Sequence, residues 1–480
     1  MTAATETGPT IGNRHLQIFM LFLGIMASYV ARANTSIAVV AMTDAENTNP
    51  DFDEFDWSNS QMQYVLSSFY WGYCLTQFFG GWLCKRYGVK ITMFFAINIC
   101  TVACLVTPVT TRAWSWQGYC GLRVIQGLAQ GLIFPCMHEH VAKWAPKQEK
   151  NRLGAFANSG LELGTVLALG TSGIIASSDM GWPGISYVAG GLGLIWAVIW
   201  IIFASNSPSD SKQISEAERK YILSSQDHDS SNKKPIPTPW RAMLTSVPFI
   251  VLVATRCSEA WGFTTMLAEV PQYMHGVLGL DIKSNALFSA LPYLIMWLMS
   301  YVYIITADII MKNNCLSLTA LRRTYNSIAF YVPAAALIAI GFVNEDQKPI
   351  AIALITLNIG VNSAATIGSS LNTIDLAPNH AGMQMAFINT AANIIPIFTP
   401  LIVGFIVEDE SNREEWQIVF IISAIIFIVG NTVYIIFGST QMQEWNDPNF
   451  LKKDDSENPT PAAITEGDTD KKTDDDVKST

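Results

Sequence analysis

The sequence predicts an all-α integral membrane protein with twelve transmembrane helices in two pseudo-symmetric six-helix halves. Of its 480 residues, 50% are hydrophobic and only 14% are charged, whereas soluble proteins carry about 25% charged residues. Residues 91–109 and 185–203 contain no Asp, Glu, Lys or Arg, and each stretch is long enough to cross a bilayer as a helix. A nucleic-acid-binding role is disfavoured because the net charge is −10 and no large basic patch is present.

Helices are expected rather than strands because a lipid-exposed backbone must satisfy its own hydrogen bonds. A membrane β-barrel would instead show alternating segments of about ten residues. The expected helices cover 16–42, 61–84, 89–109, 117–142, 152–177, 184–205, 246–274, 285–308, 325–343, 350–375, 381–407 and 416–438.

The basic residues between these spans predict the topology. Connections 2, 4, 6 and 8 hold sixteen Lys and Arg in total, whereas the odd connections hold four. Cytoplasmic loops carry the excess of positive charge, so both termini are expected in the cytoplasm. The predicted division is a cytoplasmic N-terminus (1–15), an N-terminal half (16–205), a cytoplasmic linker (206–245), a C-terminal half (246–440) and a cytoplasmic tail (441–480) that is disordered from about 452.

Arg32 is the first candidate for binding a substrate. It lies sixteen residues after Leu16, which places it about 24 Å along the first helix. Tyr29 and Ser36 share its face at spacings of three and four residues. A guanidinium flanked by two hydroxyls suits an oxyanion. The alternative is a structural arginine that pairs with a carboxylate of another helix.

The fourth helix carries Arg123, Gln130 and His138 along one side, and this side is expected to line a cavity. Gly127 and Gly131 form a small-xxx-small pair that permits close helix packing. Arg123 and Gln130 are candidate substrate contacts, although Arg123 also suits a buried pair that holds its half together. His138 lies near the cytoplasmic end, where a gating or packing role is expected.

Three carboxylates inside spans are candidates for coupling to a cation, since ionisable groups in a membrane are costly and usually face a cavity or a partner. Glu162 is expected to pair with Arg32 or Arg123, or to be a cation or proton site. Glu259 follows Arg256 by three residues, so the two side chains are positioned to neutralise each other. Glu269 precedes a proline near the exterior end, where gating or cation attraction is expected.

The eleventh helix carries Asn389, Asn393 and Pro396, followed by Pro400. The prolines are expected to kink this helix at a place that bends during transport. The eight cysteines include no CxxC pair, so they predict neither a metal site nor a disulfide framework. No constellation of an enzyme active site is visible, and no cofactor is expected.

Several segments together resemble one family of membrane proteins, the sodium/phosphate-cotransporter-like anion transporters of the major facilitator superfamily, which include sialin and the vesicular glutamate transporters. Two six-helix halves joined by a cytoplasmic loop are also the plan of that superfamily. The resemblance covers nearly the whole chain and is strongest to insect-type "putative inorganic phosphate cotransporters". The segments that carry it are 29–32 with 36–42, 69–73 with 80–81, 123–131 with 134–152, 268–274, 281–286 and 375–382.

The resemblance implies anion transport by alternating access, with Arg32 in contact with the substrate. It also exposes departures from sialin and the glutamate carriers. Gln130 stands where those members have a glutamate used in proton coupling. Leu66 and Glu259 stand where the glutamate carriers have a histidine and an arginine, so the two-arginine clamp for a dicarboxylate is missing.

The leading hypothesis is therefore a secondary transporter for an inorganic or small organic anion, coupled to Na⁺ or H⁺. One alternative is a proton-driven exporter of acidic metabolites from an acidic organelle. The other is a receptor or scaffold that no longer transports. The expected partners are a small anion and the lipid bilayer, a monomer is expected to suffice, and the expected location is the plasma membrane or a lysosomal or vesicular membrane.

Overall fold

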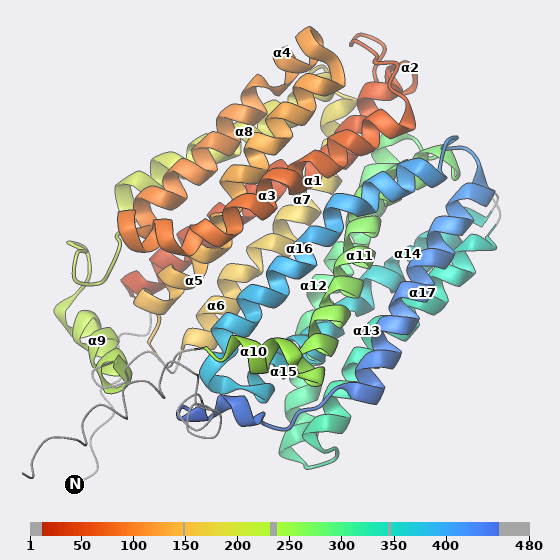
Figure 1. Ribbon diagram of the computed structural model, residues 1–480. Helices are drawn as coiled ribbons and strands as arrows, with labels where there is room; N and C mark the ends of the chain where they lie inside the picture. Colours follow the sequence, from red (N-terminus) through yellow and green to blue (C-terminus); the bar gives the residue numbers. More distant parts are fainter. Residues whose placement is uncertain (1–11, 147–148, 231–237, 344–346, 451–480) are drawn as a thin grey trace, which may run out of the picture.

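The computed structural model describes residues 12–146, 149–230, 238–343 and 347–450, and within these ranges it contains helices and no strand. Two helix bundles lie side by side, and the axes of their long helices are roughly aligned with one another (Figure 1). The predicted disorder of the tail from about 452 lies outside the described residues.

The N-terminal half is one bundle and the C-terminal half is the other, and a short helix, α9, lies between them in the chain. The N-terminal half comprises α1 (Asn13–Thr43), α3 (Asn59–Tyr87), α4 (Val89–Gln130), α5 (Ile133–Trp144), α6 (Lys150–Asn158), α7 (Gly160–Ala176) and α8 (Gly181–Phe203), with one turn, α2 (Ala45–Thr48), in its first connection. The linker holds α9 (Glu216–Ser230), and the C-terminal half comprises α10 (Trp240–Thr245), α11 (Val247–Gly276), α12 (Ile282–Lys312), α13 (Leu318–Gly341), α14 (Lys348–Asn362), α15 (Ser369–Leu376), α16 (Ala381–Ile406) and α17 (Arg413–Phe437).

Each expected span is helical over most of its length, but three of them are interrupted. The span expected over 117–142 divides between α4 and α5 at Gly131, and the span over 152–177 divides between α6 and α7 at Ser159. The span over 350–375 contains a 3₁₀ turn at Ser363–Thr366. Conversely, the expected connection before 117 shrinks to a sharp reversal within α4, where Ser115 has a φ of 50°.

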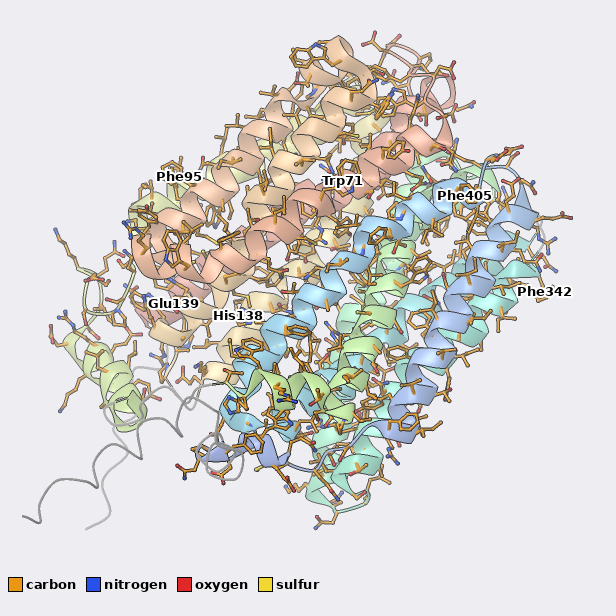
Figure 2. The ribbon with its side chains drawn as sticks, viewed as in Figure 1. Trp71, Phe95, His138, Glu139, Phe342 and Phe405 are labelled. Carbon is orange, nitrogen blue, oxygen red and sulfur yellow. The ribbon has the colours of Figure 1, made fainter. Side chains whose placement is uncertain are left out.

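Nine helical stretches among the described residues are long and apolar enough to cross a membrane. One of them, Val89–Trp144, covers two of the expected spans. Large apolar side chains cover the outside of the bundles, as expected where lipid is the solvent, and Phe95, Phe342 and Phe405 are 58%, 65% and 86% exposed (Figure 2). The protein is therefore an integral, multi-pass membrane protein.

The glycines of α4 bring α3 and α4 into backbone contact. A Cβ at Gly127 would overlap the carbonyl oxygen of Phe69, and a Cβ at Gly131 would overlap the Thr76 hydroxyl. Gly72 of α3 faces α4 in the same way, against the carbonyl oxygen of Val124. The small-xxx-small pair predicted from the sequence thus fixes the distance between these helices, and it places the aromatic side chains of α3 against the polar side of α4.

The two ends of the molecule differ in how the halves meet. We call the end that carries connection 44–58 the loop-1 end, and the end that carries α9 the linker end. Near the loop-1 end, Asn59 of α3 donates to the carbonyl oxygen of Val407, and the imidazole Nε2 of His275 lies 2.9 Å from the Asp44 carboxylate. Further along α3, Ser67 donates to the carbonyl oxygen of Ile397 over 2.6 Å. These contacts join the N-terminal half to the C-terminal half.

At the linker end, ion pairs join elements within each half or join a half to its connections. Arg14, at the start of α1, is 2% exposed and lies 2.9 Å from Glu149 and 3.0 Å from Glu218 of α9. Glu218 also accepts hydrogen bonds from the backbone N–H groups of Asn13 and Arg14. In the C-terminal half, Arg322 lies 2.8 Å from Asp375. α9 is therefore fastened to the first turn of α1.

Candidate functional site

Arg32 lies in a cage of aromatic rings. Its guanidinium carbon is 5.2 Å from the ring centroid of Tyr29, 4.7 Å from that of Phe69, 5.0 Å from that of Tyr70 and 5.2 Å from that of Tyr73. Tyr29 comes from the same helix, whereas the other three rings come from α3. A cation within about 6 Å of a ring face is attracted by the ring quadrupole. The cage therefore holds the guanidinium in place without neutralising its charge.

Arg123 reaches the same group of rings from α4. Its guanidinium carbon lies 4.8 Å from the centroid of Phe69, so Phe69 contacts both arginines. Arg123 is 3% exposed. It donates to the side-chain oxygen of Gln126 over 3.0 Å and to the backbone carbonyl oxygen of Arg32 over 3.4 Å. The two cations are thus close neighbours in the interior of the N-terminal half.

The two arginines lack a carboxylate partner. Within the described ranges neither Arg32 nor Arg123 forms an ion pair, and the Nε atom of each is buried without a hydrogen-bond partner. The sequence-based alternative of an interhelical ion pair for these residues is therefore wrong for this conformation. An uncompensated buried cation is strongly unfavourable. Binding of an anion beside these two guanidinium groups is therefore electrostatically favoured.

The other predicted substrate contacts are Tyr29, Ser36 and Gln130, and of these only Tyr29 has a hydrogen bond to Arg32. Tyr29 accepts a hydrogen bond of 3.3 Å from Arg32, as their spacing predicted. Ser36 instead donates to the carbonyl oxygen of Ala33 on its own helix. Gln130 donates to the carbonyl oxygen of Ser28 over 3.0 Å, which fastens α4 to α1 next to the cage residue Tyr29.

Glu162, in the first turn of α7, does not form the expected pair with Arg32 or Arg123. Its Oε2 atom is buried without a hydrogen-bond partner. Its helix packs against the cage, since a Cβ at Gly164, two residues further on, would lie 2.8 Å from the Cβ of Tyr29. The local cause is close packing: Gly160 and Gly164 press α7 against the backbone of α1 at Phe22 and Met26. Glu162 is thus held beside the cage with an oxygen available for a proton or a cation.

Glu259 forms the local ion pair that its spacing predicted. A guanidinium nitrogen of Arg256, on the preceding turn of α11, lies 2.5 Å from a carboxylate oxygen of Glu259. Arg256 also donates to the hydroxyl of Ser370 on α15. The side chains are 26% and 17% exposed. This pair belongs to the C-terminal half, and it is partly open to solvent.

Glu269 meets the N-terminal half directly. It is 1% exposed, and its Oε2 atom accepts a hydrogen bond of 2.9 Å from the side-chain amide of Gln63 on α3. The same amide nitrogen lies 2.8 Å from the side-chain oxygen of Gln272. The sequence indicated the position of Glu269 near one end of its helix, and the structure adds its partner in the opposite half.

The predicted gating residues lie in two places. His138 is exposed on α5, with its Nδ1 atom 2.8 Å from the carbonyl oxygen of Phe134 (Figure 2). Asn393 lies between α16 and α3: its amide donates to Gln77 over 3.1 Å and to the carbonyl oxygen of Asn389 over 2.7 Å. Pro396 lies inside α16, which continues from Ala381 to Ile406. Asn393 thus joins the halves, whereas His138 does not.

Sequence reasoning missed the aromatic walls of the site. Phe69 and Tyr70 are adjacent on α3 and Tyr73 follows one turn later, a pattern that also suits an ordinary apolar helix face. A further aromatic residue, Tyr293 of α12, is 1% exposed and has a hydroxyl without a hydrogen-bond partner. Its ring packs edge-on against that of Phe263, with centroids 6.1 Å apart.

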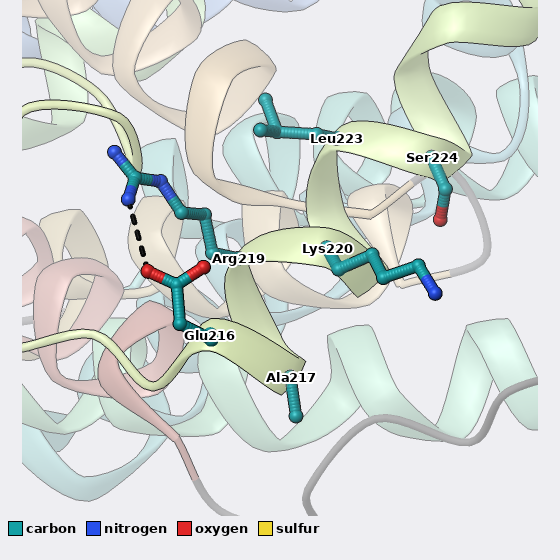
Figure 3. Close-up of a pocket in the computed structure, with 6 residues that line it drawn as sticks. All are labelled: Glu216, Ala217, Arg219, Lys220, Leu223 and Ser224. Atoms are coloured by element: carbon teal, nitrogen blue, oxygen red, sulfur yellow. Dashed lines mark hydrogen bonds and ion pairs between the residues drawn. The ribbon is translucent and has the colours of Figure 1, made fainter.

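Neither the hollow along α9 nor a group of metal ligands offers a competing site among the described residues. A hollow of about 530 Å³ lies along the outside of α9, lined by residues of that helix alone, including the ion pair Glu216–Arg219 (Figure 3). A small substrate would touch only one helix there. Across the described part of the chain, no three His, Cys, Asp or Glu side chains are grouped as metal ligands.

Comparisons with known proteins place this architecture among transporters. The family model "Major Facilitator Superfamily" matches residues 21–374. A "Putative inorganic phosphate cotransporter" of Drosophila melanogaster is 36% identical over 95% of this chain and 91% of its own length. Sialin of Homo sapiens is 31% identical over 90% of each chain. Vesicular glutamate transporter 1 of Bos taurus is 29% identical over 92% of this chain and 80% of its own.

Solved structures show the same fold at low sequence identity. The inward-open xylose transporter XylE from E. coli superimposes with a TM-score of 0.67 and 14% identity, over 91% of this chain and 99% of that chain. A bacterial homologue of the human lysosomal transporter Spinster superimposes with a TM-score of 0.66 and 12% identity, over 89% of this chain and 97% of that chain.

Proposed function

Because the chain belongs to the Major Facilitator Superfamily, we propose that it is a secondary active transporter that moves a phosphate-like or small carboxylate anion across a membrane by alternating access. Its relatives are transporters, and it is not an enzyme. The relatives that match 90% or more of the chain include a "Putative inorganic phosphate cotransporter" and sialin, and the first of these names supports a small anionic substrate here.

One observation carries the proposal: two arginines share an aromatic cage, and neither has a carboxylate partner among the described residues. Cations in a low-dielectric interior need a counter-charge. A planar guanidinium offers paired N–H donors that match a phosphate or a carboxylate. The orphaned Nε atom of Arg32 is such a donor, and an arriving anion would satisfy it.

The roles of the two arginines follow from their burial. Arg32 is partly exposed, whereas Arg123 is 3% exposed and bonded to Gln126 and to the Arg32 backbone. We therefore assign direct substrate contact to Arg32, with Tyr29 orienting it. Arg123 stabilises the anion through its charge and holds the backbone of Arg32 in position.

Coupling is assigned to a cation, either Na⁺ or H⁺, and the candidate carboxylates are Glu162, Glu259 and Glu269. Glu162 is favoured for symport because it lies beside the cage with an unpartnered oxygen. Glu259 is already neutralised by Arg256. Both termini are proposed to face the cytoplasm, in the plasma membrane or in a lysosomal or vesicular membrane, and a monomer holds the complete site.

The proposal is tested by uptake into liposomes that contain the purified protein. Inorganic phosphate and a set of small carboxylates are offered under an inward Na⁺ gradient, a proton gradient, or neither. Gradient-driven accumulation of one anion, lost in Arg32→Ala protein of normal folding, is the expected result. Accumulation only with a proton gradient directed out of an acidic compartment would favour an organellar exporter. No uptake of any anion, with folded protein, would contradict transport.

A further inference from the structure

A buried acid–amide pair holds the two halves together at the loop-1 end. Glu269 belongs to α11 of the C-terminal half, and Gln63 belongs to α3 of the N-terminal half. Both side chains are 1% exposed. The amide nitrogen of Gln63 donates to Glu269 Oε2 over 2.9 Å. The other oxygen of each side chain, Oε1, is buried and has no hydrogen-bond partner.

The two orphaned oxygens indicate which protonation state fits this contact. An ionised carboxylate at this place would receive one neutral donor, and a buried charge with so little compensation is strongly disfavoured. A protonated carboxyl has an O–H group of its own to donate. Protonation of Glu269 removes its charge and turns one carboxyl oxygen from an acceptor into a donor, which suits a contact where two acceptor oxygens are buried without a partner.

We propose that Glu269 is a proton-binding site that holds the loop-1 end closed, which is the exterior side when both termini face the cytoplasm. Glu269 keeps a proton while Gln63 contacts it. It releases the proton to the exterior when the two halves separate at this end. This deepens the proposed function, since it rests on alternating access, and it names the proton as a ligand of this end. Separation would hydrate Glu269, and hydration favours the ionised form. Exterior acid therefore favours the closed state, and exterior alkali favours the open state.

The charged groups around the pair act in the same direction. The carboxylate of Glu410, in the connection between α16 and α17, acts electrostatically on Glu269 and has a buried oxygen without a partner. Burial raises the pKa of Glu410 to about 7, with a smaller contribution from Asp409. A second negative charge at this end makes ionised Glu269 still less favourable in the closed state. Asn59 and Asn285, which face α11 nearby, are neutral.

A second contact between the halves at this end is also proton-dependent. His275 of α11 lies 2.9 Å from Asp44 at the end of α1, and the pair is ionic only when the imidazole is protonated. Acid therefore strengthens this contact as well. A cation of the same end, Arg413 at the start of α17, donates to the carbonyl oxygen of Gly341. Any test of Glu269 must therefore separate its contribution from that of His275.

The experiment measures the conformation of the purified protein in lipid nanodiscs, without substrate and without a gradient. Spin labels are placed at the exposed positions Asp179 and Glu408 on opposite halves of the loop-1 end, and the distance between them is recorded from pH 5 to pH 9. The accessible cysteines Cys74, Cys257 and Cys315 are first replaced by serine. A second labelled pair, at Arg86 and Lys312, reports the linker end.

His275→Gln protein is compared with the double variant His275→Gln/Glu269→Gln. With His275 replaced, the ratio of open to closed molecules should still rise with pH, by up to about tenfold per pH unit for one proton. The double variant carries an amide that cannot ionise at position 269, so its ratio should rise with pH less steeply than that of its parent. Glu410→Gln is the matched control, and it should shift the midpoint but keep the pH response.

Gln63→Glu provides an independent variant if the double variant does not fold. Two facing carboxylates repel when ionised, so its exterior end should open at a lower pH than that of the parent. The proposal is overturned if the double variant keeps the pH response of its parent, or if the parent shows none. The measurement needs no transport, so its failure is distinct from a failure of the proposed function.

Discussion

Arg123 donates a hydrogen bond of 3.4 Å to the backbone carbonyl oxygen of Arg32, and the two guanidinium carbons lie 4.8 and 4.7 Å from the centroid of the same ring, Phe69. Two like charges are thus held together by an aromatic ring and a backbone oxygen rather than by carboxylates. A bound anion would supply the negative charge that these two guanidinium groups lack.

Replacing Arg32 by lysine should raise the apparent KM for the transported anion by about tenfold, whereas Arg32→Ala should abolish uptake. Lysine keeps the charge but loses the planar fork that binds two oxygens at once. Concentration-dependent uptake into liposomes measures the effect, with the melting temperature as a control for folding. Normal uptake by a well-folded Arg32→Ala protein would refute the assignment.

Replacing Phe69 by leucine should weaken the attraction that holds the guanidinium groups of Arg32 and Arg123, while nearly conserving the apolar volume of the side chain. The lost cation–π attraction is worth about 1–2 kcal/mol in a desolvated site, so a weaker apparent affinity for the anion and a lower melting temperature are expected. Phe95→Leu, on the exposed outer face, is the matched control and should change neither. Equal effects of the two substitutions would show that the ring acts only by filling space.

Replacing Gln130 by glutamate should introduce or steepen a pH dependence of uptake. Gln130 donates to the carbonyl oxygen of Ser28 over 3.0 Å, and a carboxyl group can repeat that donation only when it is protonated. Uptake should therefore fall at alkaline pH in the variant. If the wild-type profile is already steep and the variant leaves it unmoved, the proton is carried by another residue.

Replacing Glu162 by glutamine should weaken the dependence of uptake on the cation gradient while retaining some exchange of anion for anion. The reason is that its unpartnered oxygen lies beside the cage, where loss of negative charge would uncouple the cation from the anion. Glu259→Gln should do less, because Arg256 already neutralises that carboxylate. Uptake under each gradient is compared with counterflow. Full gradient-driven accumulation in Glu162→Gln would make Glu162 structural.

Replacing Arg14 by alanine should destabilise the protein by about 3–5 kcal/mol, because Glu218, which is 2% exposed, would lose its charged partner. Glu149→Gln should cost less, since Glu149 is 21% exposed. Hydrogen bonding to Arg14 lowers the pKa of Glu149 below its ordinary value of 4.5. Its contribution is therefore present above pH 4.5 and is lost as the pH falls through the lowered value. Thermal unfolding in detergent at several pH values measures both effects.

The sequence alone determined the helices and the local pairs. Charge-free stretches of bilayer length predicted membrane spans because an apolar helix is stable in lipid whatever its neighbours are. Spacings of three residues predicted the contacts Tyr29–Arg32 and Arg256–Glu259, because such residues are neighbours on one helix surface. Gly127 and Gly131 likewise indicated a close helix contact, although they did not say which helix would be the partner.

Only the tertiary structure decided which distant residues meet. Phe69 contacts both arginines because glycine contacts set the distance between α3 and α4, and nothing in the spacing of α3 distinguishes that face from one that faces lipid. Glu162 was expected to pair with an arginine, but the packing of α7 on α1 leaves it beside Tyr29. Glu269 and Gln63 are separated by 206 positions. Such contacts depend on the relative placement of whole helices, which the hydrophobic pattern of each helix does not specify.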